Sequence, residues 1–362
     1  MNTKASTTKS EADRAPPGPA AGAPARLRIL LVDHIAHQKT GSFTFFRELL
    51  AKRHEVDVFY YERPYRMRLP KERIAWADCI VYLEFLPGRF RVGESGKRCV
   101  FVPMYDNEWG SVWQWHRLAR LGMRVISFCG KLTRHAVACG MHDALDVRFA
   151  LPPDDTPGAA GNPRIAALWE RGDVTASTLA HLFSPGLFNK ILLFRRPGNT
   201  PLSPLSPSFL QEYHIELHDS DYLPEEEYKA LLREPGVYIA PRFKEGIGMS
   251  FLEALAMGKF VIAHKDATMD EAIEPGVNGL LVDMRHPPHL DTLPHGDTTR
   301  ARELRHNRYG SWLADEQRIL DFFDSLPSLP PLRSPWSLFS LIAFPLYLAE
   351  GLFMRWKQRT NP

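Results

Sequence analysis

Short, continuous apolar runs separated by helical patterns constrain this chain more than any other sequence feature. The first run, LRILLVD at 27–33, is followed by a turn, a helical pattern at 43–53 and a second run, VDVFYY, at 56–61. Four to eight apolar residues without polar alternation are typical of a strand buried on both faces of a parallel sheet. Strand–helix–strand units of this kind open doubly wound domains. We therefore expect an α/β fold.

The same alternation continues along the chain and predicts two domains. Further strands are predicted at 78–83, 99–103, 125–128, 147–151, 191–194, 237–240, 260–263 and 279–282, and a helix is predicted at 132–139. At 362 residues the chain is long enough to bury two cores. The predicted organisation is a disordered tail at 1–26, a Rossmann-like domain at 27–152, a linker at 153–163, a second Rossmann-like domain at 164–328 and a C-terminal segment at 329–362.

Charge and cysteine content exclude some functions. Lys and Arg number 45 and Asp and Glu 42, a balance that gives no reason to expect nucleic acid as a partner. The four cysteines, Cys79, Cys99, Cys129 and Cys139, form no CxxC pair or Cys/His cluster. We therefore expect neither a structural metal nor a disulfide framework, and a reducing, cytoplasmic compartment fits best.

One stretch, residues 237–283, has the order of parts expected of a ligand-binding turn. A strand (VYIAP) is followed by a Glu-Gly-x-Gly turn, a helix, Gly-x-x-Val-Ile-Ala, a loop and Asn-Gly-Leu-Leu-Val. Gly246 and Gly248 allow the backbone to approach a ligand closely. The N–H groups of Met249 and Ser250 open the helix, where its dipole favours an anion. The pattern indicates a site for a diphosphate that needs no metal ion.

Two glutamates in this stretch are suited to the rest of such a ligand. Glu245 lies in the turn, and Glu253 lies about one and a half turns inside the helix, so both can face one ligand at different heights. One carboxylate can contact a sugar and the other a ribose.

This ordered stretch resembles the donor-binding core of retaining GT-B glycosyltransferases of glycosyltransferase family 4, the glycosyl transferases group 1 type. The resemblance implies two doubly wound Rossmann-like domains facing each other across a cleft. It implies that Glu245 contacts the transferred sugar near its reacting carbon, as the catalytic candidate, and that Glu253 binds the ribose hydroxyls. A Gly-Gly-x-x-Glu-like turn of the family corresponds to the loop at 264–271, where only Glu271 matches. The resemblance extends over the remainder of 27–326 only in outline.

The family usually has an Arg, and a Lys about five residues later, after the first strand of the second domain, where both neutralise the leaving diphosphate. We assign that region to 191–209, where Arg195 or Arg196 can fill the Arg role but no Lys follows. Arg242 and Lys244, just before Glu245, are alternative donor-binding cations. Solubilising surface charge explains those two equally well.

The first domain offers fewer candidates. The glycine pair usual in the family after the first strand is replaced by Lys-Thr-Gly-Ser at 39–42, in which Gly41 keeps one tight turn. His34 and His37 also follow the first strand, where ligands of parallel sheets gather. These three residues are the candidates for the acceptor side of the cleft, although a loop histidine is more often simply exposed. The family's loop histidine is missing at 104–106, where we expect structural residues.

The predicted function is transfer of a sugar from a nucleotide diphosphate sugar to a hydroxyl of a lipid-linked or polysaccharide acceptor, with retention of configuration and without metal or cofactor. The expected partners are therefore a nucleotide sugar and a glycan or lipid-linked acceptor. Two alternatives stay open: a GT-B-like subunit that binds the donor without turnover, and an enzyme of the same fold with other chemistry, such as an epimerase or a phosphorylase.

The C-terminal segment is the most apolar part of the chain. Residues 336–354, WSLFSLIAFPLYLAEGLFM, are followed by three basic residues, and Pro345 and Glu350 argue against a membrane-spanning helix. The segment is predicted to be a helix that either lies on the membrane surface or docks on the protein. In the first case, contact through 335–359 would make the protein peripheral on the inner face of the cytoplasmic membrane.

Overall fold

The structure is a computed structural model of the 362-residue chain, and it describes residues 26–63, 67–87, 92, 95–108, 112–171, 173–195, 203–219, 225–333, 345 and 349. The predicted tail, apart from its last residue, and the predicted C-terminal helix, apart from two residues, lie outside this part of the chain. Neither prediction is therefore tested. Within the described residues, no helix has both the length and the apolar character needed to cross a membrane.

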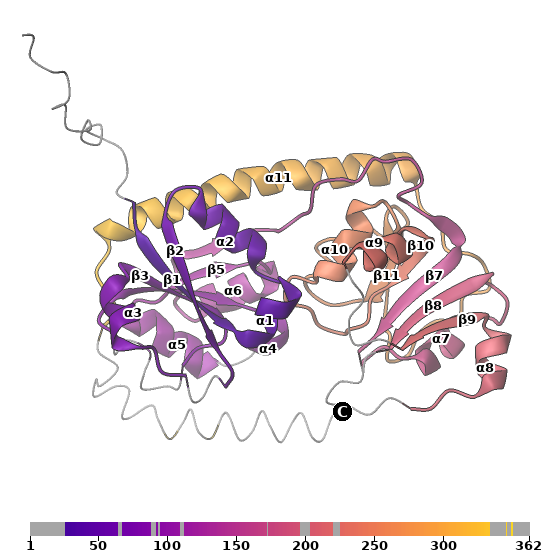
Figure 1. Ribbon diagram of the computed structural model, residues 1–362, viewed down its shortest axis with the longest axis horizontal. Coiled ribbons are helices and arrows are strands. Elements are labelled where there is room, and N and C mark those ends of the chain that lie inside the picture. The colour runs from indigo at the N-terminus through magenta and orange to yellow at the C-terminus, as the bar shows by residue number, and fades with distance from the viewer. Residues whose placement is uncertain are drawn as a thin grey trace, which may run out of the picture.

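The first domain is a six-stranded parallel sheet with helices packed on it (Figure 1). Its elements are β1 (Arg28–His34), α1 (Ile35–Thr40), α2 (Thr44–Ala51), β2 (Glu55–Tyr61), α3 (Lys71–Trp76), β3 (Cys79–Glu84), β4 (Arg98–Pro103), α4 (Tyr105–Glu108), α5 (Val112–Leu121), β5 (Arg124–Ser127), α6 (Gly130–Ala138) and β6 (Ala144–Asp146). The strand order is β2-β1-β3-β4-β5-β6. The central strands are buried along nearly their whole length because both faces of the sheet are covered.

The second domain repeats this architecture. Its elements are β7 (Asn162–Glu170), α7 (Ala176–Leu182), β8 (Lys190–Arg195), α8 (Pro207–Glu212), β9 (Ile215–Asp219), α9 (Glu225–Arg233), β10 (Pro235–Ile239), α10 (Met249–Ala256), β11 (Phe260–His264), β12 (Gly279–Val282), α11 (Thr298–Ser325) and a short 3-10 helix (Leu326–Ser328). The strand order is β12-β11-β10-β7-β8-β9, and every pair is parallel. Two parallel α/β sheets confirm the predicted fold class.

Three strand assignments differ from the sequence prediction. The strand predicted at 147–151 is wrong: the last strand of the first sheet is β6, and 147–151 connects the domains. We also missed β7, whose first residues Asn-Pro-Arg look like the end of a linker, and β9, an edge strand in which polar and apolar residues alternate. As a result, the second sheet opens at Asn162, and β8 is its second strand in chain order.

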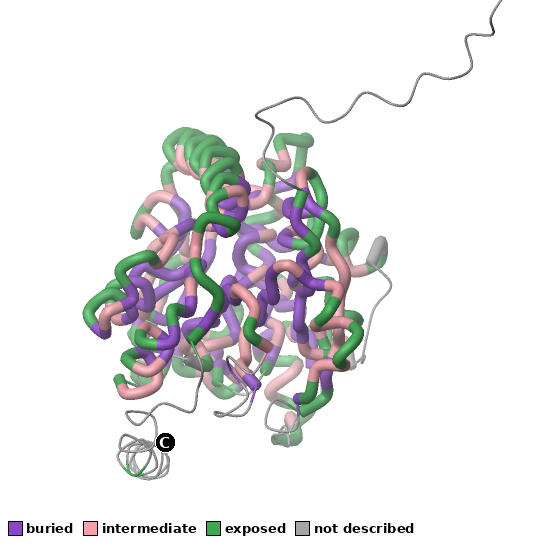
Figure 2. The backbone as a smooth tube through the Cα atoms, turned by 90° about the vertical axis from the view of Figure 1, so that its left-hand side faces the viewer, coloured by how far each residue is buried: buried purple, intermediate pink, exposed green. Residues whose placement is uncertain are grey.

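Helix α11 starts in the second domain and returns to the first, crossing both in Figure 1. In the first domain, the Trp312 ring packs against Phe149, at 4.9 Å between ring centroids, and Phe45, at 5.8 Å. Farther along α11, Asp324 accepts a hydrogen bond of 2.6 Å from Arg53. Burial is concentrated in the middle of the molecule, whereas the outer face of α11 is exposed (Figure 2). The helix therefore fastens the second domain to the first.

Replacing Trp312 with alanine tests this attachment. Trp312 is 3% exposed, so the substitution leaves a cavity in an aromatic cluster, and we expect the free energy of unfolding to fall by about 3–5 kcal/mol. Leu313→Ala is the matched control, because Leu313 is the next residue of the same helix and is 48% exposed; we expect less than about 0.5 kcal/mol there. Urea unfolding measures both, and equal losses would contradict the attachment.

Candidate active site

The carboxyl ends of the two sheets face each other and are in direct contact. Met104, directly after β4, packs on Gly246 in the turn after β10: a Cβ atom on Gly246 would lie 2.7 Å from the Met104 sulfur. Gly246 is thus required for the approach of the first domain, which the sequence prediction did not foresee. Ligands of parallel sheets bind at this edge, so the region between the two carboxyl edges, here called the cleft, is the candidate site.

Glu245 is held in this turn with its side chain almost completely buried. Its residue exposure is 8%, and burial raises the pKa of its carboxyl to about 7. Thr268, from the loop after β11, donates its hydroxyl to the backbone oxygens of Glu245, at 2.9 Å, and Gly246, at 3.3 Å. Thr268 has a φ of +74°, a conformation usually left to glycine. The structure thus fixes the catalytic candidate in position through strained backbone in a neighbouring loop.

The start of α10 has the geometry of an anion site. Gly248 caps the helix with a φ of +75°, where a Cβ would collide with the Phe251 ring. The first backbone bond of the helix runs from Leu252 N–H to Gly248 O, so the amides of Met249 and Ser250 precede the helical ladder. Both residues are only partly buried. Amides in this position are free of the helical ladder and suit an anion, so the predicted diphosphate site stays a prediction consistent with this helix start.

Glu253 lies in α10 beside an aromatic group from two other elements. Tyr228 of α9 donates its hydroxyl to a Glu253 oxygen at 3.2 Å, and the Tyr228 ring lies 5.4 Å from that of Trp169 in β7. Burial raises the pKa of Tyr228 well above its ordinary value, and the nearby Glu253 charge raises it further. The carboxylate therefore has a neutral hydrogen-bond donor on one side.

Arg195, one of the two arginines predicted to bind the diphosphate, is used elsewhere. Its Nε is 2.6 Å from Glu170 in a buried ion pair, and it donates to the Ser203 backbone oxygen at 2.7 Å. These contacts, and the place of β8 as the second strand of its sheet in chain order, give no support to the predicted donor role of Arg195. Arg196 lies outside the described residues.

Arg171 occupies the position that the sequence prediction sought. It follows β7, the first strand of the second sheet in chain order, and its side chain is exposed, with the guanidinium carbon 5.0 Å from the centre of the Trp169 ring. Burial raises the pKa of Glu245, and the positive charges of Arg242 and Arg171 oppose that rise. Five residues after Arg171 the chain has Ala176, so the second cation remains missing. Only knowledge of where β7 lies could have identified Arg171.

The two cations before Glu245 reach toward the first domain. Arg242 donates to Asp106 at 3.1 Å, across the cleft. Burial lowers the pKa of Lys244, with the charge of Asp266 opposing that change. The proximity of Arg242 and Lys244 to acidic groups of the cleft favours a local role over general surface solubility.

Glu271, predicted to approach the donor, instead binds the first domain. Its carboxylate accepts the Gly130 N–H at the start of α6, at 2.9 Å, and pairs with Arg148. An acidic group at a helix N-terminus is favourable, and this one links the two domains. The contacts of Glu271 thus indicate a role in joining the domains, and its predicted donor role stays a prediction.

The acceptor candidates of the first domain separate into two groups. His34 caps α1 through its Nδ1 and its Nε2 lies 3.0 Å from the Glu62 backbone oxygen, so it is a structural residue. Gly41 ends α1 with a φ of +66°, as expected for its tight turn. His37 alone points into a group of ionisable side chains.

That group is a chain of hydrogen-bonded and ion-paired side chains along the edge of the first sheet. His37 Nδ1 lies 2.6 Å from Asp33 and its Nε2 lies 3.3 Å from Glu84, which also accepts a bond of 2.6 Å from Asn107. Glu84 ends β3 with a φ of +64°. Burial raises its pKa to about 7, and the charges of Asp106 and Asp33 add to the rise. No motif in the sequence indicates Glu84, because topology alone brings it beside His37.

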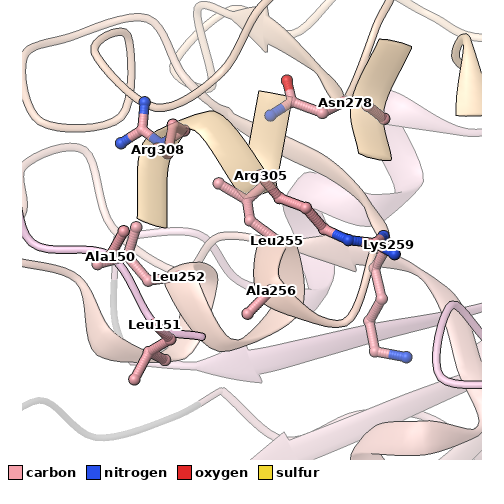
Figure 3. Close-up of a pocket in the computed structure, with 11 residues that line it drawn as sticks. Ala150, Leu151, Leu252, Leu255, Ala256, Lys259, Asn278, Arg305 and Arg308 are labelled. Atoms are coloured by element: carbon pink, nitrogen blue, oxygen red, sulfur yellow. The ribbon is translucent and has the colours of Figure 1, made fainter. Parts of the chain in front are cut away.

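A separate pocket lies between α10 and α11 (Figure 3). Leu252 and Leu255 contribute apolar surface, and Arg305 and Arg308 reach it from α11. Lys259 also lines it, and burial lowers the pKa of Lys259 to about 8; its ammonium donates to the backbone oxygens of Ala159, at 3.0 Å, and Pro235, at 2.6 Å. These bonds join backbone segments of the second domain. Among the described residues, no three His, Cys, Asp or Glu side chains are grouped so as to hold a metal ion.

Comparison with known proteins places the site in a recognised segment. The family profile "Glycosyl transferases group 1" matches residues 212–290, which include Glu245 and Glu253. Two curated relatives are named D-inositol 3-phosphate glycosyltransferase: that of Corynebacterium glutamicum is 34% identical over 113 residues, and that of Corynebacterium efficiens is 32% identical over 111. The aligned parts are 29% and 28% of this chain, and the chain spans about a quarter of each relative, 27% and 26%.

Solved structures match nearly the whole fold. A glycosyltransferase from Rickettsia africae aligns with a TM-score of 0.57 at 13% identity, over 83% of this chain and 98% of its own. The sucrose-phosphate synthase of Thermosynechococcus elongatus gives 0.54 at 14%, over 84% and 100%. The Anabaena protein HepE, solved in complex with UDP-glucose, gives 0.52 at 14%, over 83% and 100%. These likenesses confirm the GT-B fold.

The buried carboxyl of Glu245 makes a prediction about pH. In the unfolded chain, Glu245 releases its proton near pH 4.5, whereas in the folded protein it keeps the proton up to about pH 7. Between these two pH values, the free energy of unfolding therefore falls as the pH rises. Relative to the wild type, Glu245→Gln should therefore gain stability over that range, on the order of 3 kcal/mol at 1.36 kcal/mol per pKa unit.

Urea unfolding at several pH values measures this difference. Glu303→Gln, on the exposed face of α11, is the control for removal of a carboxylate. A stability difference between Glu245→Gln and wild type that stays constant with pH would contradict the burial of an ionisable Glu245.

Proposed function

We propose that the protein transfers a sugar from a nucleotide diphosphate sugar to an acceptor hydroxyl. The observation that supports this most is the arrangement at the start of α10: amides of Met249 and Ser250, Glu245 in the turn before them and Glu253 within the helix, all in the segment matched by the glycosyl transferase profile. The amides bind the diphosphate, Glu245 the sugar and Glu253 the ribose.

Arg171 supplies positive charge to the departing diphosphate in this proposal. It lies at the carboxyl edge of the second sheet, like the turn that holds Glu245, and its guanidinium can bind two phosphate oxygens. Glu245, with a pKa of about 7, is partly protonated at neutral pH and can donate a hydrogen bond to a sugar hydroxyl.

We further propose that the reaction retains configuration and needs no metal ion. The acceptor hydroxyl attacks the anomeric carbon from the face that the diphosphate leaves; the bond from that carbon to the phosphate oxygen breaks, and the acceptor proton passes to the departing phosphate. The protein contributes position and charge stabilisation, so no side chain acts as a nucleophile. Product configuration by NMR and activity in the presence of a chelator test these two points.

Binding of nucleotide sugars is the first test of the proposal. UDP-glucose is the first donor to titrate, because HepE was solved with it. We expect binding without added metal, weakened by about 1–3 kcal/mol in Glu253→Ala, which loses a ribose contact, and in Arg171→Ala, which loses a charged contact. Isothermal titration calorimetry measures both.

Two control variants sharpen this test. Glu303→Ala removes an exposed carboxylate of α11. Arg195→Ala removes the arginine of the buried pair with Glu170 and should lower the free energy of unfolding. Weaker UDP-glucose binding in Arg195→Ala than in Arg171→Ala, with both variants folded, would reverse the assignment of the two arginines. If no nucleotide sugar in a panel binds, the proposal fails. Binding without transfer would favour the non-catalytic subunit.

The acceptor is proposed to be a glycan or lipid-linked intermediate, reached by peripheral contact of 335–359 with the inner face of the cytoplasmic membrane. The proposal rests on the aromatic and basic residues of that stretch, which suit an anionic lipid surface. We expect the full chain to co-sediment with vesicles containing about 30% anionic lipid but not with neutral vesicles. Deletion of 335–362 should abolish co-sedimentation with the anionic vesicles. Equal sedimentation of both chains would contradict it.

A further inference from the structure

A second pocket, here called the α2 pocket, lies on the first domain at the carboxyl end of β1 and β2. Aliphatic side chains of β1, β2 and β3 line part of it, and its polar residues are Asp33, His37, Thr44, Arg47 and Tyr60. A concave site with apolar surface and a few polar groups is typical of small-molecule binding. No residue of this pocket other than His37 was predicted to bind a ligand from the sequence.

The two basic residues of the α2 pocket differ in their contacts: His37 is paired with Asp33, and Arg47, an exposed residue of α2, is not paired with any described residue. Asp33 is 4% exposed, and its Oδ1 accepts from the His34 N–H at 2.8 Å and lies 2.6 Å from His37. Burial alone would lower the pKa of His37, but the hydrogen bond and charge of Asp33, with the charge of Glu84, raise it. The Asp33 charge is therefore matched by His37. Among the described residues, the Arg47 guanidinium has neither an ion pair nor a hydrogen bond.

The α2 pocket is connected to the candidate active site. His37 and Asp33 belong to the pocket and also begin the chain that continues through Glu84. The charge of Asp106 adds to the pKa rise of both Glu84 and Glu245, and Asp106 is bonded to Arg242. A ligand group in the pocket thus lies beside His37, which pairs with Glu84 in the chain that continues toward the second domain.

We propose that the α2 pocket binds an anionic group, a phosphate monoester or a carboxylate, of a hydroxylated acceptor, with Arg47 as its ion-pairing residue. This rests on the sugar-transfer function proposed above. Thr44 and Tyr60 supply hydroxyl donors to the same group, and the acceptor hydroxyl that receives the sugar lies along His37 and Glu84. Guanidinium groups bind phosphate and carboxylate oxygens in pairs, which makes Arg47 selective for anions over neutral sugars.

Binding of three small probes to the full chain tests the proposal. The probes are glucose 6-phosphate, glucuronate and glucose, titrated at constant ionic strength to separate specific binding from screening. We expect at least one anionic probe to bind at least about tenfold more tightly than glucose, and Arg47→Ala to remove that preference. Arg47→Lys, which keeps the charge, should restore part of it. Arg68→Ala, which removes an exposed cation of the same domain outside the pocket, is the matched control.

The outcomes separate this proposal from the donor-site proposal. UDP-glucose binding is measured on the same samples, so loss of the donor site is detected independently of the probes. Equal affinity for glucose and both anionic probes, an unchanged preference in Arg47→Ala, an equal loss in Arg68→Ala, or no binding of an anionic probe at about 10 mM would each overturn the assignment of the pocket. Preference for glucose 6-phosphate or for glucuronate identifies the anion.

Discussion

Direct contact between the carboxyl edges of the two sheets is the constraint on which the rest of the site depends. Met104 fills the space left by the missing side chain of Gly246, and Glu271 joins the start of α6 through Gly130 and Arg148. Met104 packs on a glycine, and Glu271 accepts a bond from the backbone N–H of another glycine, so neither contact tolerates a larger side chain or a shifted strand. Residues from both domains can act on one ligand only because these contacts set the distance between the sheets.

Two residues with strained backbone hold side chains of the candidate site in place. Thr268 adopts a positive φ and donates its hydroxyl to the backbone of the turn that holds Glu245. Glu84 adopts a positive φ at the end of β3 and is held by His37 and Asn107. Non-glycine residues in this conformation cost on the order of 1–3 kcal/mol each. Both strained residues lie at the cleft, one on each side, where their position matters most.

The sequence predicted what depends on local patterns. Apolar runs identified the sheets, and the spacing of Glu245 and Glu253 identified the donor site of the proposal, because strand, turn and helix follow one another directly there. It failed where tertiary contacts decide. Arg195 and Arg196 were predicted to bind the diphosphate because β7, which begins with residues typical of a linker, was missed. Glu271 was assigned to a ligand because nothing local shows that α6 begins beside it.

The return of α11 to the first domain has a consequence for how the chain folds during synthesis. Phe149 and Trp312 are 163 positions apart, which corresponds to roughly 10–30 s of translation at about 5–20 residues per second. Through that interval the emerging first domain presents Phe45 and Phe149 to solvent, or to chaperones, without the ring that covers them in the finished protein. The first domain is therefore synthesised first, but its packing is completed only when α11 has been made.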